Sequence, residues 1–217
     1  MGKQWAKQQI KTNELQDFVD SSIKWIAANR EKVLFGAVIV VLAGALAGFA
    51  IFRHIKIRDD AWDRLSMAQA YAFTGRIDEA LKQLAEIQKD YSSSPASSYA
   101  IIFEGDILYR KGSYKEAASA YSRAMERGGK GIEPLALADL GIAQEASGLY
   151  TEAKDTSRRF LDTFPDHFMA PTVYASLARS LGRLNQTDDQ KAALQKMTLQ
   201  YPDTFWAAWA QAKLQGR

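Results

Sequence analysis

The sequence of 217 residues has no cysteine and only two histidines, His54 and His167, which lie far apart. The lack of cysteine excludes disulfide bonds, thiolate zinc sites, cysteine nucleophiles and a lipid-modified cysteine. Two distant histidines do not form a histidine-based metal centre. The chain also lacks an excess of charge of one sign, because it has 28 basic and 25 acidic residues. This balance does not give the basic surface of a nucleic-acid-binding protein. We therefore expect no cofactor, no metal ion and no nucleic-acid partner.

One segment lacks charge altogether, since Val33 to Phe52 contains no charged or strongly polar side chain. A helix rises by about 1.5 Å per residue, so this segment would span about 30 Å, the thickness of the hydrocarbon core of a bilayer. We predict a transmembrane helix over 33–52, between an N-terminal tail at 1–32 and a domain at 53–217. Gly44 and Gly48 form a G-x-x-x-G pattern that allows a second membrane helix to pack closely, although glycine is common in membrane helices generally.

A cleaved signal peptide is the alternative interpretation of this segment, because Ala45-Leu46-Ala47 resembles a cleavage site. The acidic residues before the segment and the continuation of the apolar run to Phe52 favour a retained anchor. The flanking charges do not orient it, with three basic residues on the N-terminal side and four on the C-terminal side. The further residues Lys3, Lys7 and Lys11 favour an N-terminus inside the cell.

The N-terminal tail has apolar residues at helical spacing along one stripe. They are Leu15, Phe18, Val19 and Ile26. Asn13 with Gln16 resembles a capping box that would open this helix. We expect a short amphipathic helix, which either lies at the membrane surface or is a plain stalk leading into the membrane.

After Phe52 the chain consists of amphipathic segments separated by glycine, proline and serine, which predicts an all-α domain. Internal repeats indicate its architecture. Gly75–Ala80, Gly112–Ala117 and Gly148–Ala153 follow one pattern, with alanines 37 and then 36 residues apart. Phe164-Pro165-Asp166 returns as Tyr201-Pro202-Asp203. A period of this length is typical of a solenoid of helix–turn–helix units.

These motifs resemble tetratricopeptide repeats. The resemblance implies a solenoid of about four helix pairs, in which a glycine ends the first helix of a pair and small residues allow the two helices to cross. In the second pair the small residues are Gly105 and Ala117, whereas in the fourth pair Gln190 replaces the expected alanine. The predicted pairs are 59–74 with 77–90, 96–111 with 114–128, 133–147 with 150–164, and 171–183 with 187–200.

The segment Phe205–Gln215 is expected to be a further helix that caps the solenoid. Trp206 and Trp209 would then close the open end against Leu194 and Met197. The alternative is that the two tryptophans form an exposed anchor for a partner.

Two sequence patterns predict capping boxes at the starts of second helices. Ser113 lies three residues before Glu116, and Thr187 lies three residues before Gln190. In such a box the hydroxyl and the carboxylate or amide side chain each accept a hydrogen bond from a backbone N–H at the helix end.

Other polar motifs have a structural interpretation as well. Gly128–Gly131 does not fit the phosphate-loop pattern and is expected to be a linker between repeats. The acid pairs Asp59-Asp60 and Asp188-Asp189 are expected to begin helices, where carboxylates interact favourably with the helix dipole. We find no catalytic constellation and expect that the chain is not an enzyme.

The first helix of each tetratricopeptide pair lines a concave groove, so the resemblance implies which residues face a partner. Relative to the small residue at the crossing, these positions lie one and four or five residues later, and three or six residues earlier. The implied partner-binding residues are Gln69, Phe73, Tyr99, Ile102, Asp106, Tyr109, Arg110, Glu145, Arg179 and Arg183. The alternative is that Tyr99 and Tyr109 only fill the space between adjacent pairs.

A solenoid of this kind has no chemistry of its own and binds other proteins or peptides in its groove. The order of charged tail, single span and helical repeats is similar to that of the bacterial YfgM-like inner-membrane family. This resemblance implies a scaffold with a cytoplasmic N-terminus and a periplasmic repeat domain, which assists protein translocation, chaperoning or assembly in the cell envelope. The alternatives are a cytosol-facing receptor or adaptor with the same anchor, and an envelope-assembly or division protein.

Overall fold

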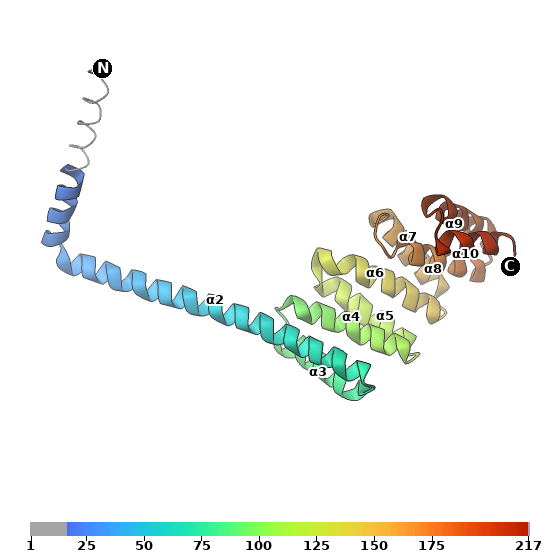
Figure 1. Cartoon of the computed structure of the whole chain (residues 1–217), viewed down its shortest axis with the longest axis horizontal. Helices are drawn as coiled ribbons and strands as arrows, with labels where there is room; N and C mark the ends of the chain where they lie inside the picture. Colours follow the sequence, from blue (N-terminus) through green and yellow to red (C-terminus); the bar gives the residue numbers. More distant parts are fainter. Residues whose placement is uncertain (1–16, 217) are drawn as a thin grey trace, which may run out of the picture. The chain divides into compact units, whose positions relative to one another are not determined.

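The computed structural model describes residues 17–216 and divides into two compact units, the first ending at Ile55 and the second beginning at Lys56 (Figure 1). All regular secondary structure in the described residues is helical. The predicted capping box of Asn13 and Gln16 lies outside the described residues, as do Lys3, Lys7, Lys11 and Leu15.

The first unit contains an exposed apolar helix. Residues 17–28 are helical, and α2 runs over Arg30–Phe73, so that its last part, residues 56–73, belongs to the second unit. The side chains of residues 34–52 are all exposed. Within residues 17–216, α2 is the one helix long and apolar enough to cross a membrane. Asp59 and Asp60 lie inside α2, so the prediction that they begin a helix is wrong.

The second unit is a stack of antiparallel helices that follow one another in chain order (Figure 1). The four pairs begin with the last part of α2 (residues 56–73), with α4, with α6 and with α8. Their second helices are α3, α5, α7 and α9, and α10 follows the last pair. This confirms the predicted all-α solenoid with a C-terminal helix. The bounds are α3 Ile77–Asp90, α4 Pro95–Arg110, α5 Tyr114–Arg127, α6 Gly129–Ala146, α7 Tyr150–Thr163, α8 Ala170–Arg183, α9 Thr187–Gln200 and α10 Phe205–Leu214.

The turn within each pair depends on one residue in the left-handed conformation. Gly75, Gly112 and Gly148 have φ of 81°, 81° and 83°, as the repeat pattern predicts. In the fourth pair the equivalent position is Asn185, with φ of 59°. Asparagine adopts this conformation more readily than other residues with a side chain, so the fourth turn keeps its shape without glycine.

The two predicted capping boxes are wrong, because neither Ser113 nor Thr187 makes a side-chain cap. The N–H of Ser113 donates instead to the carbonyl of Leu108 at 2.9 Å, which closes the turn after α4. This bond holds Ser113 at ψ of 61°, outside the extended conformation of a capping serine. Thr187 is already the first residue of α9, after the cap residue Gln186.

The prediction that Gly128–Gly131 is a linker is correct only at Gly128, since α6 begins at Gly129. Glycine costs about 1 kcal/mol in a helix relative to alanine, and Pro134 inside α6 removes one backbone donor. Ile132 offsets this cost, because its side chain is 3% exposed and belongs to the core between α4, α5 and α6. Burial of the isoleucine therefore extends the helix over glycines that favour a loop.

Three separate groups of apolar side chains form the core of the second unit. The first joins the end of α2 to α3 and α4, the second joins α4, α5 and α6, and the third joins α6 to α10. Trp206 and Trp209 are partly buried against the third group, which contains Leu194 and Met197. The predicted closure of the solenoid end by these tryptophans is confirmed.

The first three pairs cross where side chains are small. Gly105 of α4 lies so close to α5 that a Cβ built on it would be 2.6 Å from the Tyr121 ring. Ala80, Ala117 and Ala153 on the second helices are fully buried. In the fourth pair, the side chain of Gln190 lies over Gly182, whose Cβ would be 2.6 Å from the amide nitrogen of that glutamine.

We expect Gly105→Ala to lower the free energy of unfolding by about 1–3 kcal/mol, because the added methyl group overlaps the buried Tyr121 ring. The matched control is Gly131→Ala, where a Cβ meets no atom within 4 Å and the helix should gain about 0.5–1 kcal/mol. Urea unfolding of the full chain in detergent measures both. Equal effects of the two variants would contradict the close crossing.

Candidate peptide-binding groove

The residues predicted to face a groove all lie on first helices, and all but Tyr99 and Ile102 line three cavities. Each cavity lies where neighbouring first helices meet. We call the cavity between α2 and α4 the apolar cavity and the cavity between α4 and α6 the acidic cavity. The basic cavity lies among α6, α8 and α10, and residues of α7 and α9 also line it. Together the three cavities form a row along the first helices, which we call the groove.

The apolar cavity has a volume of about 480 Å³. Phe73 on α2 and Phe103 on α4 line it together with small alanines. The Phe73 side chain is 95% exposed, which leaves its ring free to contact a ligand. The Arg110 guanidinium lies over the Phe103 ring, with its central carbon 5.9 Å from the ring centroid. The cavity therefore offers aromatic faces with one cation at its border.

The acidic cavity is smaller, about 170 Å³, and contains the carboxyl groups of Asp106 on α4 and Asp139 on α6. The hydroxyl of Tyr121 donates a hydrogen bond to Asp106 Oδ1 at 2.8 Å. Burial raises the pKa of Asp106, although this hydrogen bond and the charge of Arg110 oppose the shift. Burial and the negative charge of Asp106 also raise the pKa of Tyr121.

Asp139 is the more perturbed carboxyl group. Burial, followed by the negative charge of Asp106, raises the pKa of Asp139 to about 7. In residues 17–216 no hydrogen bond or ion pair is found for its side chain. The sequence did not predict Asp139 as a groove residue, because it lies two residues before Gly141 and outside the counted groove positions. The available signal was that it is the single charged residue between Glu133 and Glu145.

The basic cavity has a volume of about 670 Å³. Glu145 on α6 accepts hydrogen bonds from Arg179 Nε and Nη2, at 2.6 Å and 2.8 Å, and from Ser176 Oγ at 2.7 Å. Arg183 on α8 and Lys213 on α10 are exposed and have no ion-pair partner among the described residues. Lys213 lies on α10, outside the counted groove positions, and was not predicted. The cavity thus has positive charge beyond what Glu145 neutralises.

Two predicted groove residues have other environments. The Tyr99 ring lies 5.3 Å from the Trp62 ring on α2 and is 39% exposed, so it fills the space between adjacent first helices and keeps one free edge. Ile102 is 9% exposed and belongs to the core of the second pair, which leaves it no surface for a partner. Tyr109 lines the acidic cavity and also contacts Tyr114, with ring centroids 5.1 Å apart.

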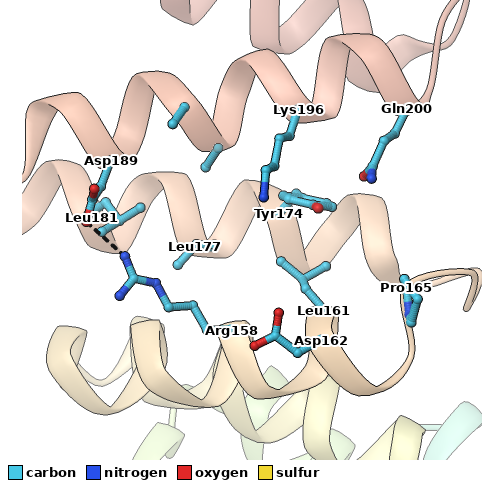
Figure 2. A pocket seen from close by; sticks show the side chains of 12 residues that line it. Arg158, Leu161, Asp162, Pro165, Tyr174, Leu177, Leu181, Asp189, Lys196 and Gln200 are labelled. Carbon is cyan, nitrogen blue, oxygen red and sulfur yellow. Dashed lines mark hydrogen bonds and ion pairs between the residues drawn. The ribbon is translucent and has the colours of Figure 1, made fainter.

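A fourth cavity, of about 510 Å³, lies on the side of the second helices, between α7 and α9 (Figure 2). Lys196 points into it from α9 and Asp162 from α7, and the apolar Leu177 of α8 lies between these two helices. At its rim Arg158 Nη2 is 2.8 Å from Asp189 Oδ2. This cavity was not predicted, and it lies outside the groove.

Comparisons with known proteins identify the repeats. Residues 65–132 and 136–167 each match a tetratricopeptide-repeat family model. A search of curated proteins found no match. The matched regions contain the glycine turns and the crossing residues of the first three pairs. The chain therefore carries tetratricopeptide repeats, as the repeated motifs predict.

Solved structures have the same fold. A tetratricopeptide repeat protein from Parabacteroides merdae matches with a TM-score of 0.61 at 15% identity, over 71% of this chain and 58% of that chain. A double mutant of MamA RS-1 matches with a TM-score of 0.55 at 18% identity, over 73% and 94%. MamA AMB-1 matches with a TM-score of 0.51 at 20% identity, over 61% and 68%. At these identities the likeness is one of fold.

We expect Asp139→Asn to raise the free energy of unfolding by about 1–3 kcal/mol near pH 8. The folded state holds a proton on Asp139 up to about pH 7, where its pKa lies, whereas the unfolded chain releases it near pH 4. Stability of the parent therefore falls as the pH rises through this range, and the asparagine variant escapes that loss.

Urea unfolding at several pH values measures this difference. The advantage of the variant should shrink as the pH is lowered from about 8 to about 4. The exposed Asp63 supplies the control, because Asp63→Asn should change stability little at any of these pH values. An advantage of Asp139→Asn that does not depend on pH would contradict the assignment.

Proposed function

We propose that this chain, which carries tetratricopeptide repeats, is a membrane-anchored scaffold that binds an extended segment of another protein in its groove. Tetratricopeptide repeats indicate a protein-interaction scaffold with no enzymatic chemistry of its own. The observation that carries the proposal is the row of three cavities along the first helices, each with its own side-chain chemistry. The partner would lie across α2, α4, α6 and α8 in turn.

The membrane anchor in this proposal is the segment 33–52 of α2. Its side chains are exposed almost throughout, including Phe35 at 69% and Val40 at 71%, and such a run of apolar surface is unfavourable in water. A Cβ on Gly44 or Gly48 would meet no atom within 4 Å in this unit. A second membrane helix could therefore approach the backbone at these glycines.

The cellular role in this proposal is assistance to protein translocation, chaperoning or assembly in the bacterial cell envelope. It is supported by the resemblance of the chain order to the YfgM-like inner-membrane family and by the lysines of the N-terminal tail. The N-terminus would be cytoplasmic and the repeats periplasmic. A cytosol-facing adaptor with the same anchor is the alternative, because the charges on both sides of the segment are nearly balanced.

Protease treatment of sealed spheroplasts distinguishes the two orientations. We expect the repeat domain to be digested from outside, because a periplasmic domain is accessible there. A cytoplasmic loop of another inner-membrane protein should stay protected in the same sample and serves as the control for sealed membranes. A repeat domain that becomes sensitive only after the membrane is broken would establish the cytosol-facing alternative.

Crosslinking to a partner tests the groove. We expect the double substitution Tyr109→Ala with Arg110→Ala to weaken partner capture by more than about 1 kcal/mol, because both side chains line the acidic cavity. The measurement is the amount of partner that co-purifies with the full chain from crosslinked membranes.

The matched control is the substitution Lys115→Ala with Glu116→Ala, since both residues are exposed on the second helix α5. Its capture should equal that of the parent. Melting curves of both variants show whether the fold is intact, and Arg110→Glu alone repeats the test without loss of the Tyr109–Tyr114 contact. Equal losses from the groove variant and the control would remove the groove from the proposal.

A further inference from the structure

The three cavities of the groove differ in chemistry in a fixed order along the chain. The apolar cavity contains Phe73 and Phe103, the acidic cavity contains Asp106 and Asp139, and the basic cavity contains Arg183 and Lys213 as the cations that Glu145 does not neutralise. A ligand that lies along the first helices would meet these surfaces one after another. The order of the surfaces therefore constrains the order of side chains in the ligand.

The spacing of the cavities suits an extended peptide. Packed helices have axes about 8–10 Å apart, and successive cavities begin one first helix further along the solenoid, at α2, α4 and α6. An extended peptide in the polyproline-II conformation advances by about 3.1 Å per residue, so neighbouring cavities correspond to positions about three residues apart. This conformation has three residues per turn, so side chains three residues apart face the same surface.

The acidic cavity restricts the charge of the ligand's side chain most strongly. Its charged groups are Asp106, Asp139 and Arg110, and its remaining polar groups are the hydroxyls of Tyr109 and Tyr121. Arg110 and the Tyr121 hydroxyl lower the pKa of Asp106, whereas the negative charge of Asp106 raises the pKa of Asp139. Asp139 thus has no compensating cation, and a positive side chain entering the cavity would supply one.

We propose that the groove selects an extended segment in which a basic side chain lies between an apolar side chain and an acidic one, each about three residues away. The basic group binds at Asp139, the apolar side chain lies against Phe73 and Phe103, and the acidic group meets Arg183 and Lys213. This inference rests on the proposed binding of a partner segment in the groove.

Four labelled synthetic peptides test the order. Two have a central basic residue: Leu-Ser-Ser-Arg-Ser-Ser-Glu and its reverse, because the direction of the chain in the groove is open to either sense. Two have the same composition with a central acid: Leu-Ser-Ser-Glu-Ser-Ser-Arg and its reverse. Fluorescence anisotropy with the full chain in detergent should show that one peptide with central arginine binds at least about tenfold more tightly than both peptides with central glutamate.

Asp139→Asn identifies the residue that makes this selection. We expect the variant to lose about tenfold in affinity for the preferred peptide near pH 8 and to keep its weak binding of the central-glutamate peptides. In the parent, the affinity for the preferred peptide should fall as the pH is lowered from about 8 to about 6, because a proton on Asp139 competes with the arginine. The asparagine variant should show no such dependence, whereas Asp63→Asn should behave like the parent.

The outcomes separate this inference from the proposed function. Binding that Tyr109→Ala with Arg110→Ala weakens, but that is equal for all four peptides, overturns the order of side chains and leaves the groove in place. Binding of no peptide up to about 1 mM also overturns the inference, while partner capture through α4 would still uphold the groove. A preference for the central-arginine peptide that survives Asp139→Asn shows that Asp139 does not hold the basic group and overturns its assignment.

Discussion

The close crossing of the two helices in each pair is the constraint on which the rest of the structure depends. Gly105 can lie against the Tyr121 ring only because it has no side chain, and the buried Ala80 and Ala153 have the same role in the first and third pairs. With the crossing fixed, one face of each first helix is left without a covering helix. Side chains on that face then meet those of the next pair, which is why Asp106 and Asp139, 33 positions apart in the numbering, share one cavity.

Much of the fold is readable from the sequence, because the features that determine it are local. A glycine at a fixed distance before a small residue predicts the turns at Gly75, Gly112 and Gly148, and the helix bounds follow from them. In two of the predictions that failed, an interaction outside the local motif prevails. Ser113 is not a side-chain cap because its N–H closes the preceding turn, and α6 extends over glycines because Ile132 is buried.

The groove is predictable only in part. Counting from the crossing residue selects Asp106, Tyr109 and Arg110, which line one cavity, but the same count includes Ile102, whose side chain is in the core. Asp139 and Lys213 are not among the positions counted from the crossing residue, because their place in the groove depends on how one pair packs against the next. That packing depends on side-chain volumes in several helices at once, and no single motif contains it.

The division of the core into three groups, each built from helices adjacent in the sequence, has a consequence for how the protein is made. Contacts that join near neighbours in the chain need little loop closure, so they form rapidly. The group that joins the end of α2 to α3 and α4 is complete once those helices have left the ribosome. Synthesis and folding can therefore advance together, pair by pair, with the tryptophans of α10 closing the stack as its final step.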